Sequence, residues 1–236
     1  MDDLNVYACD AGSVSKDNFH WVSTHNLSNE FGDISKLAEY IATDLKASQK
    51  VAIGFECVLF IPCPTDQQTL GKARNGECTA ETGNKPFTAS AGACATMSGL
   101  PALGWLMRQI KKNCPEATAT TRWSDFESGL ANIFIWEAFV SGHEKGDTHG
   151  EDARLAVEGF MHALPTIENS TRVTATEPFS FAGSLILWSD LSSDTSLLKA
   201  PVIVIRPNIP KEVIQERIEK AKRVSAEKRR LKKESS

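Results

Sequence analysis

Short apolar runs along the chain alternate with segments of helical periodicity. Two β-rich runs, Asn5–Asp10 and Phe19–Thr24, stand on either side of a small-residue turn, which predicts an antiparallel hairpin. A helix is expected over Ile34–Ala47, because apolar residues recur there every four positions and Asp33 is placed to cap it. Further expected elements are strands at Val51–Cys57, Ala117–Trp123 (weaker), Ile133–Val140 and Val202–Ile205, and helices at Ala89–Asn113, kinked or broken at Pro101, and Gly150–Leu164. The pattern over 180–190 suits a helix or a strand equally well.

This alternation indicates an α/β protein, and a hairpin followed by β-α units indicates a mixed sheet. We expect a single domain over residues 1–207. A stretch rich in proline and glycine, at about 61–88, predicts an irregular insertion. Connections of that length are usually functional or disordered. A charged helix or tail is expected over 208–236.

Composition narrows the class of protein. The chain has 236 residues, of which 41% are hydrophobic, and it has no uncharged apolar stretch of membrane-spanning length. These features argue against wholesale disorder and against a membrane span. Met1-Asp2-Asp3 does not open a signal peptide, and no pair of the six cysteines has C-x-x-C spacing. A reduced, cytoplasmic protein is expected.

The net charge of −4 is unevenly distributed. Residues 211–236 carry ten Lys/Arg and five Glu, or +5, so the rest of the chain carries −9. Charges four residues apart in the tail are typical of an exposed helix, and a solvated terminal helix is the favoured interpretation. The alternative is a basic arm that binds nucleic acid or a protein partner.

Acidic residues interrupt the apolar elements. Asp10 ends the first strand, Glu56 ends VAIGFE, Glu137 lies inside IFIWEAF, and Asp152 lies in the first turn of a helix. Burying a carboxylate is costly unless it is paired, hydrogen-bonded or bound to metal. Convergence of the four at one end of a sheet would suit a hard cation such as Mg²⁺ or Mn²⁺.

Each acid also has a plainer explanation. Asp10 could shape the turn that follows it, and Asp152 could interact with the helix dipole. Glu56 could reach water at a strand end. Glu137 is harder to explain in this way, because apolar residues flank it on both sides.

The order of these segments resembles the RNase H-like fold, which RNase H, RuvC-type resolvases and transposase and integrase cores share. It resembles more narrowly the uncharacterised family of predicted RNase H-like nucleases of bacteria. That family usually has Asp-x-Pro after the second acidic strand, where this chain has Glu56-Cys57-Val58. The resemblance is carried by YACDAGS (7–13), AIGFEC (52–57), FIWEAF (134–139) and EDARLAVEGF (151–160).

The resemblance implies a mixed five-stranded sheet flanked by helices, and hydrolysis of phosphodiester bonds in DNA or RNA by two Mg²⁺ or Mn²⁺ ions. Asp10 would bridge both ions, and Glu56, Glu137 and Asp152 would complete their ligand shells. Lys145 would contact phosphate. His149 would carry a proton, or serve only as the residue that begins its helix.

Two other functions stay open. The chain could be a non-catalytic RNase H-like module whose tail holds a partner. Asp10-Ala-Gly-Ser also resembles the first phosphate loop of actin-like ATPases and kinases, although a second glycine-rich loop is not found. Basic residues of the insertion, Lys72, Arg74 and Lys85, could contact a phosphate backbone, but a solvated surface is favoured for them.

Overall fold

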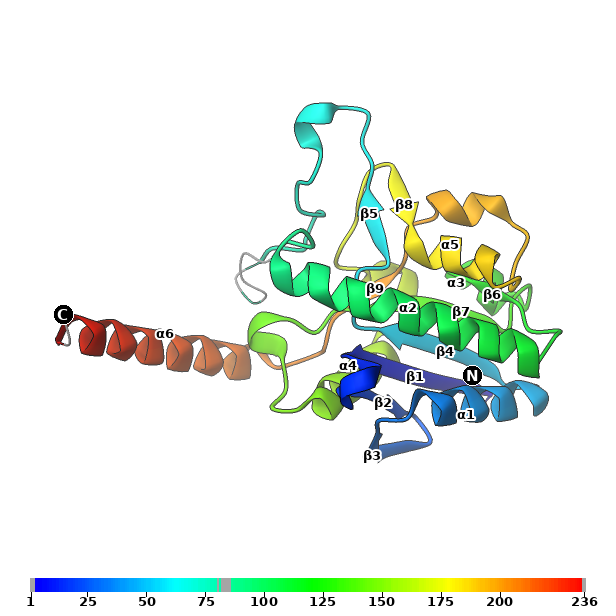
Figure 1. The fold of residues 1–236 in the computed structure, drawn as a ribbon, viewed down its shortest axis with the longest axis horizontal. Helices are drawn as coiled ribbons and strands as arrows, with labels where there is room; N and C mark the ends of the chain where they lie inside the picture. The colour runs from blue at the N-terminus through cyan, green and yellow to red at the C-terminus, as the bar shows by residue number, and fades with distance from the viewer. Residues whose placement is uncertain (1–2, 80, 82–85, 235–236) are drawn as a thin grey trace.

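A mixed sheet lies at the centre of the computed structural model, which describes residues 3–79, 81 and 86–234 (Figure 1). The strands are β1 (Leu4–Ala11), β2 (Phe19–Ser23), β3 (Asn26–Phe31), β4 (Lys50–Phe55), β5 (Phe60–Pro62), β6 (Ala119–Thr120), β7 (Ile133–Ala138), β8 (Pro178–Ser180) and β9 (Val204–Ile205). The α-helices are α1 (Ile34–Lys46), α2 (Ser90–Asn113), α3 (Trp123–Glu127), α4 (His149–Ala163), α5 (Phe181–Trp188) and α6 (Lys211–Glu234). Short 3-10 helices are η1 (Val14–Lys16), η2 (Gln67–Thr69), η3 (Gly142–Glu144), η4 (Ile167–Ser170) and η5 (Thr195–Lys199).

The central sheet has seven strands in the order β3-β2-β1-β4-β7-β6, and β9 also pairs with β7. β1, β2 and β3 are antiparallel neighbours, whereas β4, β6, β7 and β9 run parallel to β1. β6 pairs with the start of β7 and β9 with its end, so the two short strands share one edge. The five strands expected from the resemblance are therefore too few. A separate two-stranded sheet joins β5 to β8.

Helices cover both faces of the central sheet. Alternate residues of a strand point to opposite faces, so Tyr7 and Cys9 of β1 join the core under α1, α2 and α5, while Val6 and Ala8 join the core under α3 and α4. Figure 1 shows α1 and α2 lying across one face, with α6 projecting away from the body. The placement of α4 matters most for the site, because it packs on β1 and β2.

Most expected elements are found within a few residues of their predicted bounds. The hairpin β1–β2 is confirmed, and so are α1 with its Asp33 cap, whose carboxylate accepts from the Ser35 amide at 2.7 Å, and the strands β4 and β7. The segment 180–190 forms helix α5. α2 runs through Pro101 as one helix, and only Ala119–Thr120 of the weaker strand pairs with β7. Strand β3 and the β5–β8 sheet were not predicted.

The insertion at 61–88 contacts the body of the protein through several regular pairings. β5 overlaps its start, and Asn75 forms a bridge with Thr174. Residues 80 and 82–85, which include Lys85, lie outside the described residues, as do 235–236 at the end of the tail. All six cysteines are free thiols. Among the described helices, none combines the length and the apolar character needed to cross a bilayer.

Candidate metal centre

Asp10 and Glu56 come from neighbouring parallel strands. Asp10 is the penultimate residue of β1 and shares the α4 face of the sheet with Ala8. Glu56 follows β4 directly, and its amide donates to the Cys9 carbonyl at 2.8 Å, which continues the parallel pairing by one residue. Because parallel strands end at the same edge of a sheet, the two carboxylates lie side by side.

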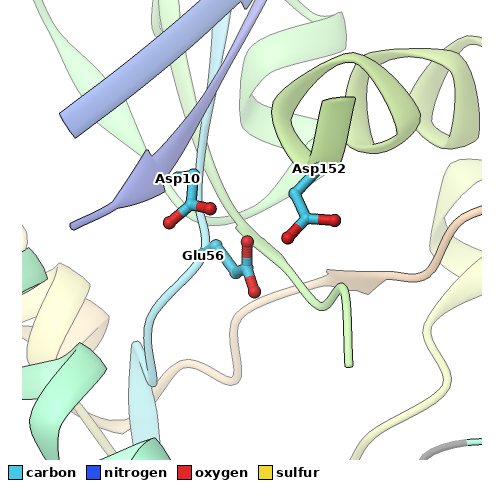
Figure 2. Close-up of side chains that lie close together, drawn as sticks. All are labelled: Asp10, Glu56 and Asp152. Carbon is cyan, nitrogen blue, oxygen red and sulfur yellow. The ribbon is translucent and has the colours of Figure 1, made fainter. Parts of the chain in front are cut away.

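The third carboxylate comes from the first turn of α4. Thr148 caps this helix, and its hydroxyl accepts from the Glu151 amide at 3.1 Å. Asp152 therefore projects toward the sheet, where the Gly146 amide donates to its Oδ1 at 2.6 Å. One carboxylate oxygen from each of Asp10, Glu56 and Asp152 lies within 4.8 Å of the other two (Figure 2).

Two cationic or titratable side chains border this cluster. Lys145 Nζ lies 3.0 Å from Glu56 Oε1 and 2.9 Å from Asp152 Oδ2. His149 Nδ1 lies 2.7 Å from Asp10 Oδ2, and the His149 ring stacks on His20 with centroids 5.8 Å apart. An ionised carboxylate only accepts hydrogen bonds, so beside an ionised Asp10 it is Nδ1 that donates, which leaves Nε2 for another partner.

The electrostatics of the cluster favour bound positive charge. Burial raises the pKa of Glu56 well above its usual range, and the neighbouring charge of Asp10 raises it further, although Lys145 opposes the rise. Burial also raises the pKa of Asp152 against the lowering effect of Lys145. Burial disfavours the charged form of Lys145, but Glu56 and Asp152 outweigh this effect and raise the Lys145 pKa. Glu56 Oε2 is buried and has no hydrogen-bond partner within the described part of the chain.

Glu137, the fourth carboxylate expected at this site, is not among the residues that converge. It lies on β7 in register with Phe55, one residue before Glu56, and its alternation places it on the face of Ile133 and Ile135. That is the face opposite α4, so the pleat of the sheet separates Glu137 from the cluster.

Glu137 is instead the partner of a buried arginine. Arg74 Nη1 and Nη2 donate to its two carboxylate oxygens at 2.8 Å each, and the Leu59 amide donates to Oε2 at 2.9 Å. Arg74 also donates to Glu77 Oε1 through Nε at 3.0 Å and Nη2 at 2.8 Å. All three charged side chains are at least 97% buried. Arg74 is therefore a core residue that anchors the insertion, not the surface residue that sequence reasoning favoured.

The three carboxylates offer oxygen ligands, and an amide, the Lys145 ammonium and the His149 imidazole lie at the rim of the cluster. Oxygen donor sets suit Mg²⁺ and Mn²⁺, whereas zinc sites usually include histidine or cysteine. Searches of protein-family models, curated proteins and solved structures returned no match to this chain. The donor set and its geometry therefore carry the chemical interpretation by themselves.

Proposed function

We propose that this protein is a divalent-metal-dependent hydrolase of phosphodiester bonds in nucleic acid. Asp10, Glu56 and Asp152 would hold Mg²⁺ or Mn²⁺. The observation that carries the proposal is the meeting of these three carboxylates within 4.8 Å, with the buried Glu56 Oε2 directed to no described partner. A buried carboxylate oxygen without a donor is costly, and a bound cation would satisfy it.

The topology supports an RNase H-like arrangement of this site. An antiparallel set β1–β2–β3 precedes the parallel strands β4 and β7, and the acids stand at the ends of the two adjacent strands β1 and β4. A late helix, α4, then supplies the third acid to the same end of the sheet. The sequence resemblance implies four acids in the order strand, strand, strand and helix, and the cluster contains the first, second and fourth of them.

The residues around the cluster have roles that follow from their contacts. A bound divalent ion would supply a Lewis acid for the phosphate and a water of lowered pKa. Lys145, once the carboxylates are neutralised, would turn its ammonium to a phosphate oxygen. His149 is held by Asp10 through Nδ1, and its side chain is 53% exposed, so Nε2 is suited to exchange a proton with water. The two-ion arrangement stays a prediction, because Glu137 is engaged by Arg74.

The position of α6 favours a nucleic acid substrate. Arg217 Nη1 donates to the carbonyls of Lys145, at 2.8 Å, and His143, at 3.1 Å, so the basic helix begins at the rim of the cluster. The segment 211–236 carries a net charge of +5 in a chain whose remainder is acidic. A basic helix that starts beside a phosphate-cleaving site would attract the phosphate backbone.

One observation favours a second candidate, a non-catalytic module of the same fold. The Lys145 ammonium already contacts both Glu56 and Asp152, and could itself be the resident cation of the cluster. The substitution Lys145→Met separates the two candidates. A metal site should bind Mn²⁺ at least as tightly after the competing ammonium is removed. A non-catalytic module should bind no Mn²⁺ in either form and should lose stability.

The central test replaces Asp10 by asparagine, which keeps the shape and the acceptor oxygen but removes the charge. We expect Asp10→Asn to remain folded by circular dichroism, to lose Mn²⁺ binding by titration calorimetry, and to lose cleavage of a labelled DNA and RNA panel. Glu158→Gln is the matched control, because Glu158 is an exposed acid on α4 that pairs only with Arg154 in the described structure. Cleavage by Asp10→Asn at the wild-type rate would refute the proposed function.

A further inference from the structure

A pocket with a cavity volume of about 170 Å³ opens beside the carboxylate cluster. Glu56 and Lys145 belong to both, so the pocket and the candidate metal centre are continuous. Most of the remaining lining is apolar and comes from four segments: the residues after β4, the residues before α2, the first turns of α2, and the end of β7 with the residues after it. These segments contribute Phe87, Ala95, Phe139 and Val140.

The size and the walls of the pocket suit one small ring system. Pockets for drug-sized ligands usually measure about 300–1,000 Å³, so this one would take a single planar group. Phe87 and Phe139 line it and are both only partly buried. Aromatic side chains in such positions stack with nucleobases, and each stacked base contributes about 1–3 kcal/mol.

The charges around the pocket determine which part of a nucleotide can enter. Among the described lining residues Lys145 is the only basic one, whereas Glu77 and Glu137, which both pair with Arg74, are acidic. The mostly apolar walls disfavour a phosphate inside the pocket. Lys145 contacts Glu56 and Asp152, so it lies where the pocket meets the carboxylate cluster. A nucleotide therefore fits in one orientation, with its neutral base in the pocket and its phosphate at the cluster.

We propose that this pocket holds the base of one unpaired nucleotide whose phosphate lies at Asp10, Glu56 and Asp152. The inference rests on the proposed function and specifies its substrate class. A base inside the pocket is separated from its stacking and pairing neighbours, so single strands and frayed ends are substrates and continuous duplex is not.

The test uses two phenylalanine substitutions on the same helix. Ala95→Phe places a ring in the pocket, whereas Ala93→Phe adds the same ring at an exposed position of α2. The probes are AMP, UMP and ribose 5-phosphate, each titrated in the presence of Mn²⁺. Wild type and Ala93→Phe should bind the nucleotides about 5–150 times more tightly than ribose 5-phosphate, which is the stacking contribution expressed as affinity. Ala95→Phe should lose that preference and keep its Mn²⁺ affinity.

A second variant guards against a folding defect. Phe87→Leu keeps an apolar wall but removes the ring face, and it should reduce the same preference without changing the circular dichroism spectrum. Equal affinity for nucleotides and ribose 5-phosphate in wild type would overturn the pocket assignment, as would cleavage of duplex and single strand at equal rates. Neither result would bear on the proposed metal centre, which is refuted separately if Asp10→Asn retains cleavage.

Discussion

Glu56 is expected to destabilise the metal-free protein, and Glu56→Gln should therefore increase its free energy of unfolding. The partly buried Glu56 carboxylate lies beside the carboxylates of Asp10 and Asp152, and its buried Oε2 has no described donor. Glutamine keeps an acceptor oxygen for Lys145 and directs an amide donor toward the other two acids. Residues that serve function often reduce stability in this way.

The expected gain follows from two opposing contributions. Removing an unsatisfied buried acceptor is worth about 1–3 kcal/mol. Losing the Lys145–Glu56 pair costs up to about 1 kcal/mol, because the Lys145 side chain is 44% exposed and Asp152 remains as its partner. A net gain of about 1–2 kcal/mol would raise the Tm by about 2–8 °C for a chain of this length.

The sign of the pH dependence follows from the raised pKa of Glu56. Below the unfolded pKa of about 4.3, the side chain is protonated in both states and the variant has no advantage. As pH rises from there toward the folded pKa, wild type must release a proton that the folded state holds more tightly, so wild type loses stability relative to Glu56→Gln. Above the folded pKa the difference stays constant.

Thermal unfolding from pH 5 to 8, with EDTA and then with Mn²⁺, measures both effects. In EDTA the variant should be the more stable protein at pH 7, and the gap should shrink toward pH 5. Saturating Mn²⁺ should reverse the order, because a ligand at 100 times its Kd adds about 2.7 kcal/mol to the form that binds it. A variant that is less stable than wild type in EDTA at pH 7 would refute the reasoning about Glu56.

Two arginines give further predictions. Arg74→Met should cost about 3–5 kcal/mol in urea unfolding, since two carboxylates stay buried without their cation. Arg122→Ala, which breaks a more exposed pair, should cost clearly less, and equal losses would contradict the anchoring role of Arg74. Arg217→Ala should speed amide hydrogen exchange over 142–148, where its carbonyl partners lie, while the exposed-site variant Lys220→Ala should not. Unchanged exchange in Arg217→Ala would show that α6 does not hold this segment.

Local pattern was informative where one physical signal dominated. The hairpin was predictable because two β-rich runs stand on either side of a small-residue turn, and α1 and α4 were predictable because their apolar residues recur along one buried face. Over 180–190 the segment is apolar on all sides, so periodicity could not separate helix from strand. In the structure this segment is a helix, and the Ser180 hydroxyl caps it by accepting from the Gly183 amide at 2.9 Å.

By itself, the sequence determined that Asp10, Glu56 and Asp152 stand at the ends of a strand, a strand and a helix, where carboxylates of adjacent elements meet. Only the tertiary structure determined that Glu137 lies outside the carboxylate cluster. Both faces of β7 are apolar, so the sequence pattern does not show on which face of the sheet Glu137 lies. The pairing register of β7 with β4 determines that face. The burial of Arg74 was likewise not predictable, because its partner Glu137 lies 63 residues away and becomes a neighbour only when the insertion folds against the sheet.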